Sequence, residues 1–297
     1  MKVRVKFTKT GSLRFTGHLD LMRFFQKALR ISGIKMAYTK GYSPHMILSF
    51  AAPLGVGMES LGEYFDAELA YRDPVLHTAD DDERLKDIGL INEELPLCPP
   101  ASVLIEMLNA VMPSGIRIAG ITRIEEGKSG KAMSLVKEAS YITVLSGIGA
   151  DVSEASEKFG AFLTEEKIIV HKITKKAEAD VDIRPMLHKA KTLLIKNETE
   201  TSKGTETSEA AEFLKEIKAD FDWTRIPEFY RKAAEGERFA FYAECATGSA
   251  AHLRPDMLAE AFCRYAGYEF NEYDVRVLRL DTFTDGGLSL GALGEDF

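Results

Sequence analysis

The sequence predicts an α+β protein composed of two ferredoxin-like (βαββαβ) domains in tandem, the second of which is decorated. With 297 residues, the chain is long enough for two domains that each bury a core. Segments that alternate apolar and polar residues, as strands do, are separated by segments with helical periodicity. In the first half of the chain they follow the order strand, helix, strand, strand, helix, strand, which is the order of a ferredoxin-like unit.

The first predicted domain covers residues 1–127. Charged and apolar side chains alternate over residues 2–8, which is typical of a half-buried strand. A helix is predicted from His18 to Ser32, because apolar residues recur at three- and four-residue spacing and Gly33 suits the position after a helix end. The other elements expected in this domain are strands at 35–40, 46–51, 62–71 and 116–124, and helical segments within 82–112.

The second predicted domain covers residues 131–297 and follows a polar, glycine-containing stretch at 125–130 that marks the boundary. Residues 196–208 consist of polar residues and one glycine, which predicts a mobile loop. The elements expected here are strands at 141–145, 167–174, 179–183, 238–245 and 273–280, and helices at 153–164, from about residue 185, at 209–221 and at 255–265.

Basic residues are concentrated at the N-terminus. Residues 1–45 contain ten basic residues and a single acidic residue, Asp20, whereas the rest of the chain contains 28 basic and 45 acidic residues. The N-terminal segment therefore carries a formal charge of +9 and the remainder −17. This asymmetry predicts an anionic partner for the N-terminal region, nucleic acid first among them, and the acidic remainder would confine that contact to one face.

Several classes of protein are disfavoured by the residues present. No stretch approaches the roughly 20 apolar residues of a membrane helix, and the N-terminal alternation is unlike a signal peptide, so we expect a cytoplasmic protein without membrane contact. Cys98, Cys245 and Cys263 are widely spaced, which argues against a disulfide framework. The apolar run around Cys245 and the helical pattern around Cys263 predict that these two are small core residues. Neither cysteines nor histidines have the spacing of a metal site, and no nucleophile motif occurs. We therefore expect no catalytic residues, no metal and no cofactor.

The first predicted helix combines a polar start with a basic face. Arg14 and His18 lie near its N-terminus, where unpaired backbone N–H groups favour anions. His18 is either a tuned acid–base group or an ordinary residue of a helix start. The basic residues that recur at helical spacing on the outward face are Arg23, Lys27 and Arg30.

The segment from Lys40 to His45 predicts a tight turn rich in groups that contact nucleic acid. Tyr42 can stack on a base, Ser43 can donate to a phosphate, and His45 can do either. Alternatively, the turn only links two strands, which the glycine and the proline of this segment would explain by themselves.

Two arginines of the second half suggest a different anion site. Arg184 and Arg254 each precede a proline suited to the first helical position, and Ser249 lies in a small-residue loop before the second one. An arginine beside helical N–H groups suits a phosphate or a carboxylate. In the alternative interpretation, these arginines pair with neighbouring acids, namely Asp182, Glu244 or Asp256.

Several motifs of the first 70 residues occur together in one bacterial family. They are Arg14-Phe15, His18 to Arg23, Gly41 to His45, Ser49 to Ala51, and the run from Pro53 to Asp66. In these motifs the chain resembles the family described as radical-SAM-linked or radical-SAM-associated, whose members are fused behind a radical SAM enzyme or occur as separate chains. The Arg-Pro segments at 184 and 254 fit its later part more loosely.

The resemblance implies a radical SAM enzyme as partner. Through the proteins with which that family is usually associated, it also implies a link to RNA such as tRNA or rRNA. A radical SAM cluster requires three closely spaced thiolates, whereas the cysteines here are 147 and 18 residues apart. This chain would therefore be the accessory half of such a pair.

We expect a radical-SAM-associated accessory protein that binds RNA or presents a substrate and is non-catalytic on its own. One alternative is a metal-independent RNA-processing enzyme that uses His18 and His45 as acid and base. Another is a small-anion or nucleotide-binding protein that uses Arg184 and Arg254. The enzyme alternative requires both histidines to reach one substrate atom, which the distance between them decides.

Overall fold

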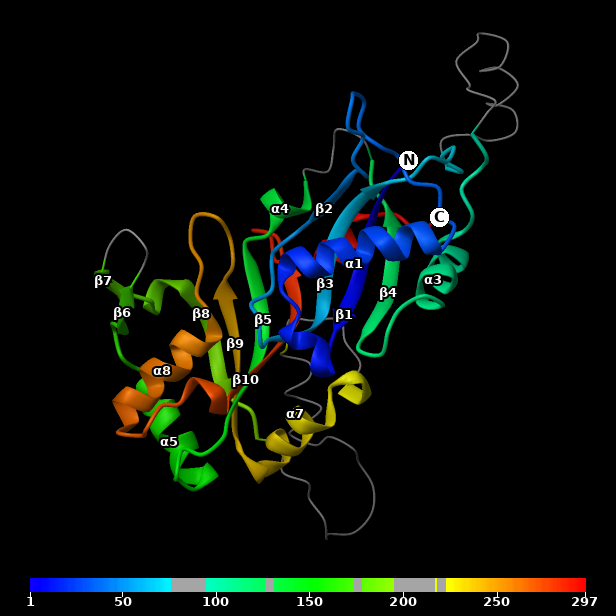
Figure 1. Ribbon diagram of the computed structural model, residues 1–297. Helices are drawn as coiled ribbons and strands as arrows, with labels where there is room; N and C mark the ends of the chain where they lie inside the picture. Colours follow the sequence, from blue (N-terminus) through cyan, green and yellow to red (C-terminus); the bar gives the residue numbers. More distant parts are fainter. Residues whose placement is uncertain (76–94, 126–130, 174–177, 195–216, 218–222) are drawn as a thin grey trace, which may run out of the picture. The chain divides into compact units, whose positions relative to one another are not determined.

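The computed structural model describes residues 1–75, 95–125, 131–173, 178–194, 217 and 223–297 (Figure 1). These residues form a mixed α+β fold whose strands pair mostly antiparallel, which confirms the predicted α+β class. The contacts between residues divide the chain into two compact units. Unit 1 comprises Met1–Val56, Gly62–Val136 and Gly286–Phe297, and unit 2 comprises Gly57–Leu61 and Lys137–Asp285.

These contact units and the predicted domains, 1–127 and 131–297, divide the chain differently. The C-terminal residues 286–297 group with unit 1, and residues 57–61 group with unit 2. The predicted domain boundaries stay a prediction. The predicted loop at 196–208 lies outside the described residues, as does the helix at 209–221 apart from Ile217.

Unit 1 contains a small sheet. Its strand order is β4-β1-β3, with β2 pairing on β3, and both the β1–β4 and the β2–β3 pairs are antiparallel. The first residues of β3 belong to unit 2. The elements are β1 (Lys2–Lys9), η1 (Gly11–Phe15), α1 (His18–Ile31), β2 (Leu48–Phe50), β3 (Glu59–Glu68), α3 (Ala101–Asn109), β4 (Ile116–Arg123), α4 (Ala132–Leu135) and η6 (Leu290–Leu293).

The core of unit 1 lies between this sheet and its helices. Figure 1 shows α1 across one face of β3, β1 and β4. Alternation along β1 directs Phe7 to this face, where its ring centroid is 4.7 Å from that of Phe25 on α1. Phe50 and Phe65 join the same ring cluster. Burying four phenyl rings supplies much of the apolar area that stabilises the unit.

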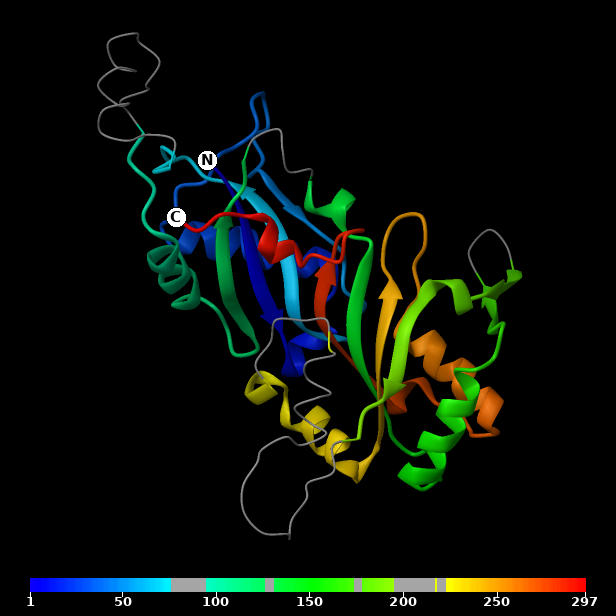
Figure 2. The same ribbon diagram turned by 180° about the vertical axis from the view of Figure 1, so that it is seen from behind.

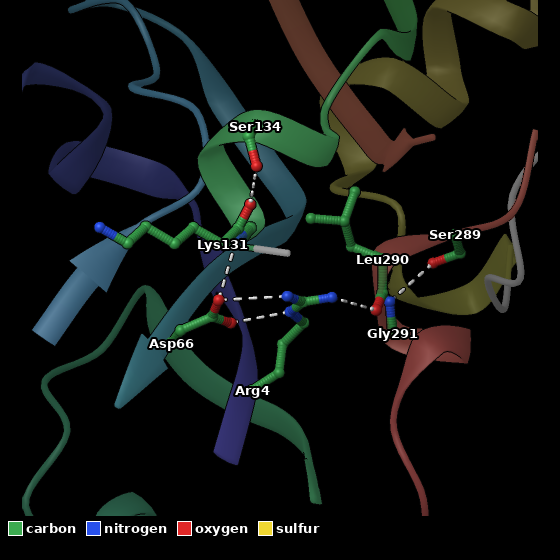
Figure 3. Close-up of polar contacts among 8 residues, drawn as sticks. Arg4, Asp66, Lys131, Ser134, Ser289, Leu290 and Gly291 are labelled. Atoms are coloured by element: carbon green, nitrogen blue, oxygen red, sulfur yellow. Dashed lines mark hydrogen bonds and ion pairs between the residues drawn. The ribbon is translucent and has the colours of Figure 1, made fainter. Parts of the chain in front are cut away.

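The opposite face of the same strands carries a buried ion pair (Figure 3). Arg4 on β1 is 1% exposed, and its Nε and Nη2 donate to the two carboxylate oxygens of Asp66 on β3, at 2.8 and 3.1 Å. Nη1 of Arg4 donates to the carbonyl of Leu290 at 3.3 Å, and the backbone N–H of Ala132 donates to Asp66 at 2.9 Å. One pair of side chains thus joins two strands, α4 and the C-terminal segment.

The C-terminal segment completes unit 1. Figure 2 shows it on the face of the strands opposite α1. Leu290 is fully buried, and the backbones of Glu295 and Arg123 exchange hydrogen bonds of 2.8 and 2.9 Å. The guanidinium of Arg123 also binds Asp73, at 3.2 Å, and the carboxylate of Glu295. The chain end is therefore part of the core structure of this unit.

Unit 2 contains strands in the order β10-β5-β9-β8, all antiparallel, and residues 59 and 60 of β3 pair parallel with β10. Strands β6 and β7 form a separate hairpin. Phe159 of α5 stacks on Phe241 of β9 at 4.8 Å and contacts Phe262 of α8 at 5.0 Å. The elements are β5 (Glu138–Leu145), α5 (Val152–Phe162), β6 (Ile169–Ile173), β7 (Glu178–Asp182), β8 (Leu187–Thr192), α7 (Glu228–Lys232), β9 (Phe239–Ala246), α8 (Pro255–Ala266) and β10 (Val275–Phe283).

Two expected elements differ in the structure. The helix predicted from about residue 185 is wrong: a single 3-10 turn, Arg184–Met186, leads directly into β8. A proline suits the first turn of any helix, so it does not specify the length, and the following residues pair with β9 instead. The strand expected at 35–40 is reduced to isolated bridges, Met36 to Leu69 and Tyr38 to Met46.

Within the described ranges, no helix is both long and apolar enough to cross a membrane. All three cysteines are free and buried, which confirms the prediction of Cys245 and Cys263 as core residues. Burial raises the pKa of Cys98 and of Cys263 to about 11, so these thiols stay protonated at neutral pH.

Gly115 has a conformation and surroundings that only glycine accommodates. Its φ is +96°, and an added Cβ would lie 2.5 Å from the carbonyl oxygen of Thr10. We predict that Gly115→Ala lowers the free energy of unfolding by more than the 1–2 kcal/mol or so that a left-handed conformation costs by itself. Gly11→Ala is the matched control, because Gly11 has φ +65° and open space. Urea denaturation would contradict this account if both variants lost the same stability.

Removing one partner of the buried ion pair should be costly. We predict that Asp66→Ala destabilises the protein by about 3–5 kcal/mol, because it leaves the Arg4 guanidinium buried and uncompensated. Asp20→Ala breaks an exposed pair with Arg23 and should change stability by less than about 0.5 kcal/mol. In urea titrations, the double variant Arg4→Met/Asp66→Leu should lose less stability than Asp66→Ala; an equal or larger loss would argue against a charge effect.

Candidate nucleic-acid interface

The outward face of α1 is basic and open to solvent. Arg23, Lys27 and Arg30 are exposed, whereas the residues buried on the other side are Leu21, Phe25, Ala28 and Leu29. Arg23 approaches the carboxylate of Asp20 at 3.4 Å, but both side chains are at least 70% exposed, so the pair is weak. Lys27 and Arg30 make no hydrogen bond or ion pair with any described residue. We name Arg23, Lys27 and Arg30 the α1 basic face.

The chain between α1 and β2 forms a narrow hairpin that projects away from the strands (Figure 1). Its sides are held by the Tyr38–Met46 bridge and by hydrogen bonds from Thr39 N–H to the His45 carbonyl, 2.9 Å, and from His45 N–H to Thr39 Oγ1, 3.0 Å. Gly41 turns the tip with φ +123°. All residues of the tip, 39–45, are exposed. We name this segment the 39–45 tip; it includes the predicted contacts Lys40, Tyr42, Ser43 and His45.

The start of α1 is more enclosed than its outward face. The guanidinium of Arg14 lies 4.4 Å from the ring centroid of Phe15 and donates to the Gly11 carbonyl at 3.3 Å. The His18 ring is half-buried and meets the ring of Phe50 edge-on, with centroids 5.4 Å apart. These contacts support the interpretation of His18 as an ordinary packing residue of the helix start.

His45 lies five residues before Phe50, the residue on which the His18 ring packs. The chain from His45 to Phe50 is extended beside β3, and five steps of about 3.3 Å span roughly 16 Å. Because His18 packs on Phe50, the two imidazoles are on the order of 10 Å or more apart. An acid and a base that act on one substrate atom must each lie within about 3 Å of it. This distance disfavours the enzyme alternative.

Two of the ten N-terminal cations are buried, which the charge count did not reveal. Arg4 is buried against Asp66, and Lys9 is 1% exposed with its Nζ donating to the carbonyls of Arg14, 3.2 Å, and Thr16, 2.9 Å. The alternation along β1 could have predicted the burial of Lys9. Lys9 lies two residues after the buried Phe7, so its side chain points to the same face of the strand. The surface charge of this region is therefore lower than the sequence count of +9.

In the part of the chain that the structure describes, no hydrogen bond or ion pair brings together the residues of the anion site predicted in the second half. Nε of Arg254 donates to Asp256 at 3.0 Å and Nη2 binds the same carboxylate. Arg184 donates to the Leu187 carbonyl at 3.3 Å, and Ser249 is exposed in a four-residue turn. Among the described residues, no hydrogen bond or ion pair joins Arg184 to Arg254 or Ser249. The pairing of Arg254 with Asp256 favours the alternative in which neighbouring acids occupy the arginine.

A buried acid of unit 2 escaped the sequence analysis. Glu59 is 1% exposed, and its Oε2 accepts from the Tyr230 hydroxyl at 2.8 Å and from Arg276 at 2.6 Å. The Phe229 ring lies under the Arg276 guanidinium, 4.4 Å away. Burial, with the adjacent carboxylate, raises the pKa of Tyr230 far above its ordinary value. The cluster ties residue 59 to α7 and β10, and no local pattern around Glu59 indicates it.

His252 offers a test of the electrostatics of unit 2. Desolvation and the charges of Arg279, Lys172 and Arg254 lower its pKa below 6.5, against a smaller opposite effect of Asp256. The unfolded chain therefore takes up this proton at a higher pH than the folded chain. Stability should be full above about pH 6.5 and fall as the pH drops towards the folded pKa.

We predict that Lys172→Ala raises the pKa of His252, as measured by NMR titration of its imidazole protons. His252→Gln should flatten the loss of stability between pH 6.5 and 5, because the titrating group is gone. Lys167→Ala removes a cation that is absent from the neighbours of His252 and should leave its titration unchanged. A His252 pKa at or above 6.5 in the unmodified chain would contradict this assignment.

Comparison with protein-family models gives a match to the family described as "Uncharacterized protein conserved in bacteria (DUF2344)". The match covers residues 2–87 and 90–227, which is most of the chain and includes the α1 basic face and the 39–45 tip. A search of curated proteins gives no significant match. The family description mentions neither an activity nor a radical SAM enzyme. With three quarters of its length matched, the chain belongs to this conserved bacterial family of uncharacterized proteins.

Proposed function

We propose that this protein is an RNA-binding accessory protein, non-catalytic on its own, and that it contacts RNA through the α1 basic face and the 39–45 tip. The observation that carries the proposal is the exposure of Lys27 and Arg30 without an acidic partner among the described residues. Isolated cations on a surface contribute little to the stability of the fold. If they bind the phosphates of a nucleic acid, they neutralise these phosphates and release the counterions of the nucleic acid.

The surroundings of these cations support an RNA contact confined to one region. Asp20 is the single acid among residues 1–45, and it is exposed beside Arg23. The remaining chain carries a formal charge of −17, so it repels a polyanion. Helical geometry places Arg23 and Lys27 about 6 Å apart along the axis, which lets neighbouring side chains reach different phosphates.

We also infer that both units are ferredoxin-like. In unit 1, β1, α1, β2, β3, α3 and β4 follow each other, and the strand order is β4-β1-β3-β2. In unit 2, β5, α5, β8, β9, α8 and β10 give the order β10-β5-β9-β8. The second unit would then be decorated by the β6–β7 hairpin and by α7. The same strand order in both units supports this inference.

The radical SAM enzyme enters the proposal as a partner. Support comes from the motif resemblance, of which the segments at 14–23 and 41–45 belong to the proposed RNA surface. The cysteines of this chain are buried, and burial raises the pKa of each thiol, so they are poorly suited to act as ligands of an iron–sulfur cluster. We therefore assign the chemistry to the partner, and substrate presentation in the cytoplasm to this protein.

The proposal is tested by removing the α1 basic face. Arg23→Ala/Lys27→Ala/Arg30→Ala should weaken RNA binding and reduce the slope of log affinity against log salt by about 2, since each phosphate contact contributes about 0.7 for a single strand. The three side chains are exposed, so folding should be unaffected. Affinity is measured by fluorescence anisotropy with a labelled RNA at several salt concentrations.

A matched control removes the same number of charges elsewhere. Lys167→Ala/Lys232→Ala/Arg264→Ala changes three exposed cations of unit 2, two of which pair with acids of their own helices. This variant should keep both the affinity and the slope. If the two triple variants behave alike, net charge and not the α1 basic face governs binding, and the proposed surface is wrong.

A further inference from the structure

We propose that this surface selects RNA with an unpaired base, and that Tyr42 stacks on that base. The inference deepens the proposed function and rests on it. The α1 basic face would bind phosphates, and the 39–45 tip would distinguish unpaired from paired bases. The substrate class is therefore single-stranded or looped RNA, in contrast to a continuous duplex.

Tyr42 is the most exposed aromatic residue in the part of the chain that the structure describes, ahead of Tyr273 at 85%. Its side chain is completely exposed, with a relative accessibility of 112%, and it makes no hydrogen bond, ring contact or ion pair with any described residue. Tyr141 and Tyr230, in contrast, are at most 1% exposed and hydrogen-bonded. A fully exposed aromatic ring contributes nothing to the fold, and it is the group that stacks on bases of single strands.

Hydrogen bonds hold the backbone that carries this ring, although the ring contacts no described residue. Two hydrogen bonds between Thr39 and His45 close the hairpin below the tip, and Gly41 makes the turn that brings Tyr42 to its end. A ring carried on a closed hairpin loses less conformational freedom on binding than one on an open loop. The tip therefore presents an aromatic platform whose backbone is already ordered.

The groups beside Tyr42 suit the phosphates that flank a stacked base. Lys40 lies two residues before it, and Ser43 and His45 lie one and three residues after it; all three are exposed. No acid occurs between Asp20 and Glu59 in the sequence. A ring with cationic and hydroxyl donors on both sides is the arrangement found where a protein stacks a base and holds its backbone.

The state of the RNA follows from the geometry of stacking. In a continuous duplex, both faces of each base are covered by neighbouring bases, and the major groove of A-form RNA is too deep and narrow for side chains to read. A ring at the end of a projecting hairpin can cover a base only where the stack is interrupted. Loops, bulges and single strands provide such bases.

The experiment compares two forms of one RNA with the full chain. A fluorescein-labelled 12-nucleotide RNA of mixed sequence is titrated as a single strand and as a blunt duplex with its complement. We expect tighter binding of the single strand. Tyr42→Ala should weaken single-strand binding about ten-fold, within the range for loss of one stacked base, and should leave duplex binding unchanged.

Tyr42→Phe is the matched control, because it keeps the ring and removes the hydroxyl; its affinity should stay within about two-fold of the unmodified chain. Tyr42→Leu, which keeps an apolar side chain without a π face, should behave like Tyr42→Ala. Since Tyr42 touches no described residue, all three variants should melt at the same temperature as the parent chain.

The outcomes separate this inference from the function on which it rests. Unchanged single-strand affinity in Tyr42→Ala, with a loss in the Arg23/Lys27/Arg30 triple variant, overturns the stacking inference and leaves RNA binding intact. Equal weakening of the single strand and the duplex also overturns it, because the ring would then be a general contact. If the unmodified chain binds neither RNA form, the proposed function itself fails, and the tip would have to serve a protein partner.

Discussion

Unit 1 depends on the placement of one positive charge. The Arg4 guanidinium is almost completely withdrawn from water, and a buried charge is tolerated only when it is paired and hydrogen-bonded. Asp66 provides the pair from β3, and the Leu290 carbonyl provides the third acceptor from the C-terminal segment. Asp66 also accepts from the backbone of α4. Segments more than 200 residues apart in the sequence are thereby fixed to one side chain.

This network assigns different tasks to the two sides of the strands of unit 1. One face is occupied by the ion pair, by α4 and by the C-terminal segment, so its polar groups serve the fold. The other face is covered by α1, whose apolar side fills the core and whose basic side faces solvent. Lys27 and Arg30, which have no ionic partner among the described residues, lie on the outside of that helix.

Several cations of unit 2 are paired with acids. Arg254 pairs with Asp256, Arg264 with Glu260, Lys232 with Glu228, and Arg276 with the buried Glu59. Each of these four cations has an acid close in sequence or buried beside it, which cancels much of its field. Lys27 and Arg30 of unit 1 have no such partner among the described residues, and we assign the proposed RNA contact to their face of α1.

Periodicity in the sequence was sufficient to predict β1, α1, β4, α5, β9 and α8 within a few residues, because these elements bury one regular face. It also predicted the exposed stripe of α1, and the local contexts of Cys245 and Cys263 predicted that they are buried. Tertiary contacts alone decided that Arg4 and Lys9 are internal, that residues 187–192 form a strand, and that Glu59 is buried beside Tyr230 and Arg276. They also decided the separation of His18 from His45. A local pattern reports how one segment divides between core and solvent, whereas the burial of a charge depends on a partner that can lie hundreds of residues away, as Leu290 does from Arg4.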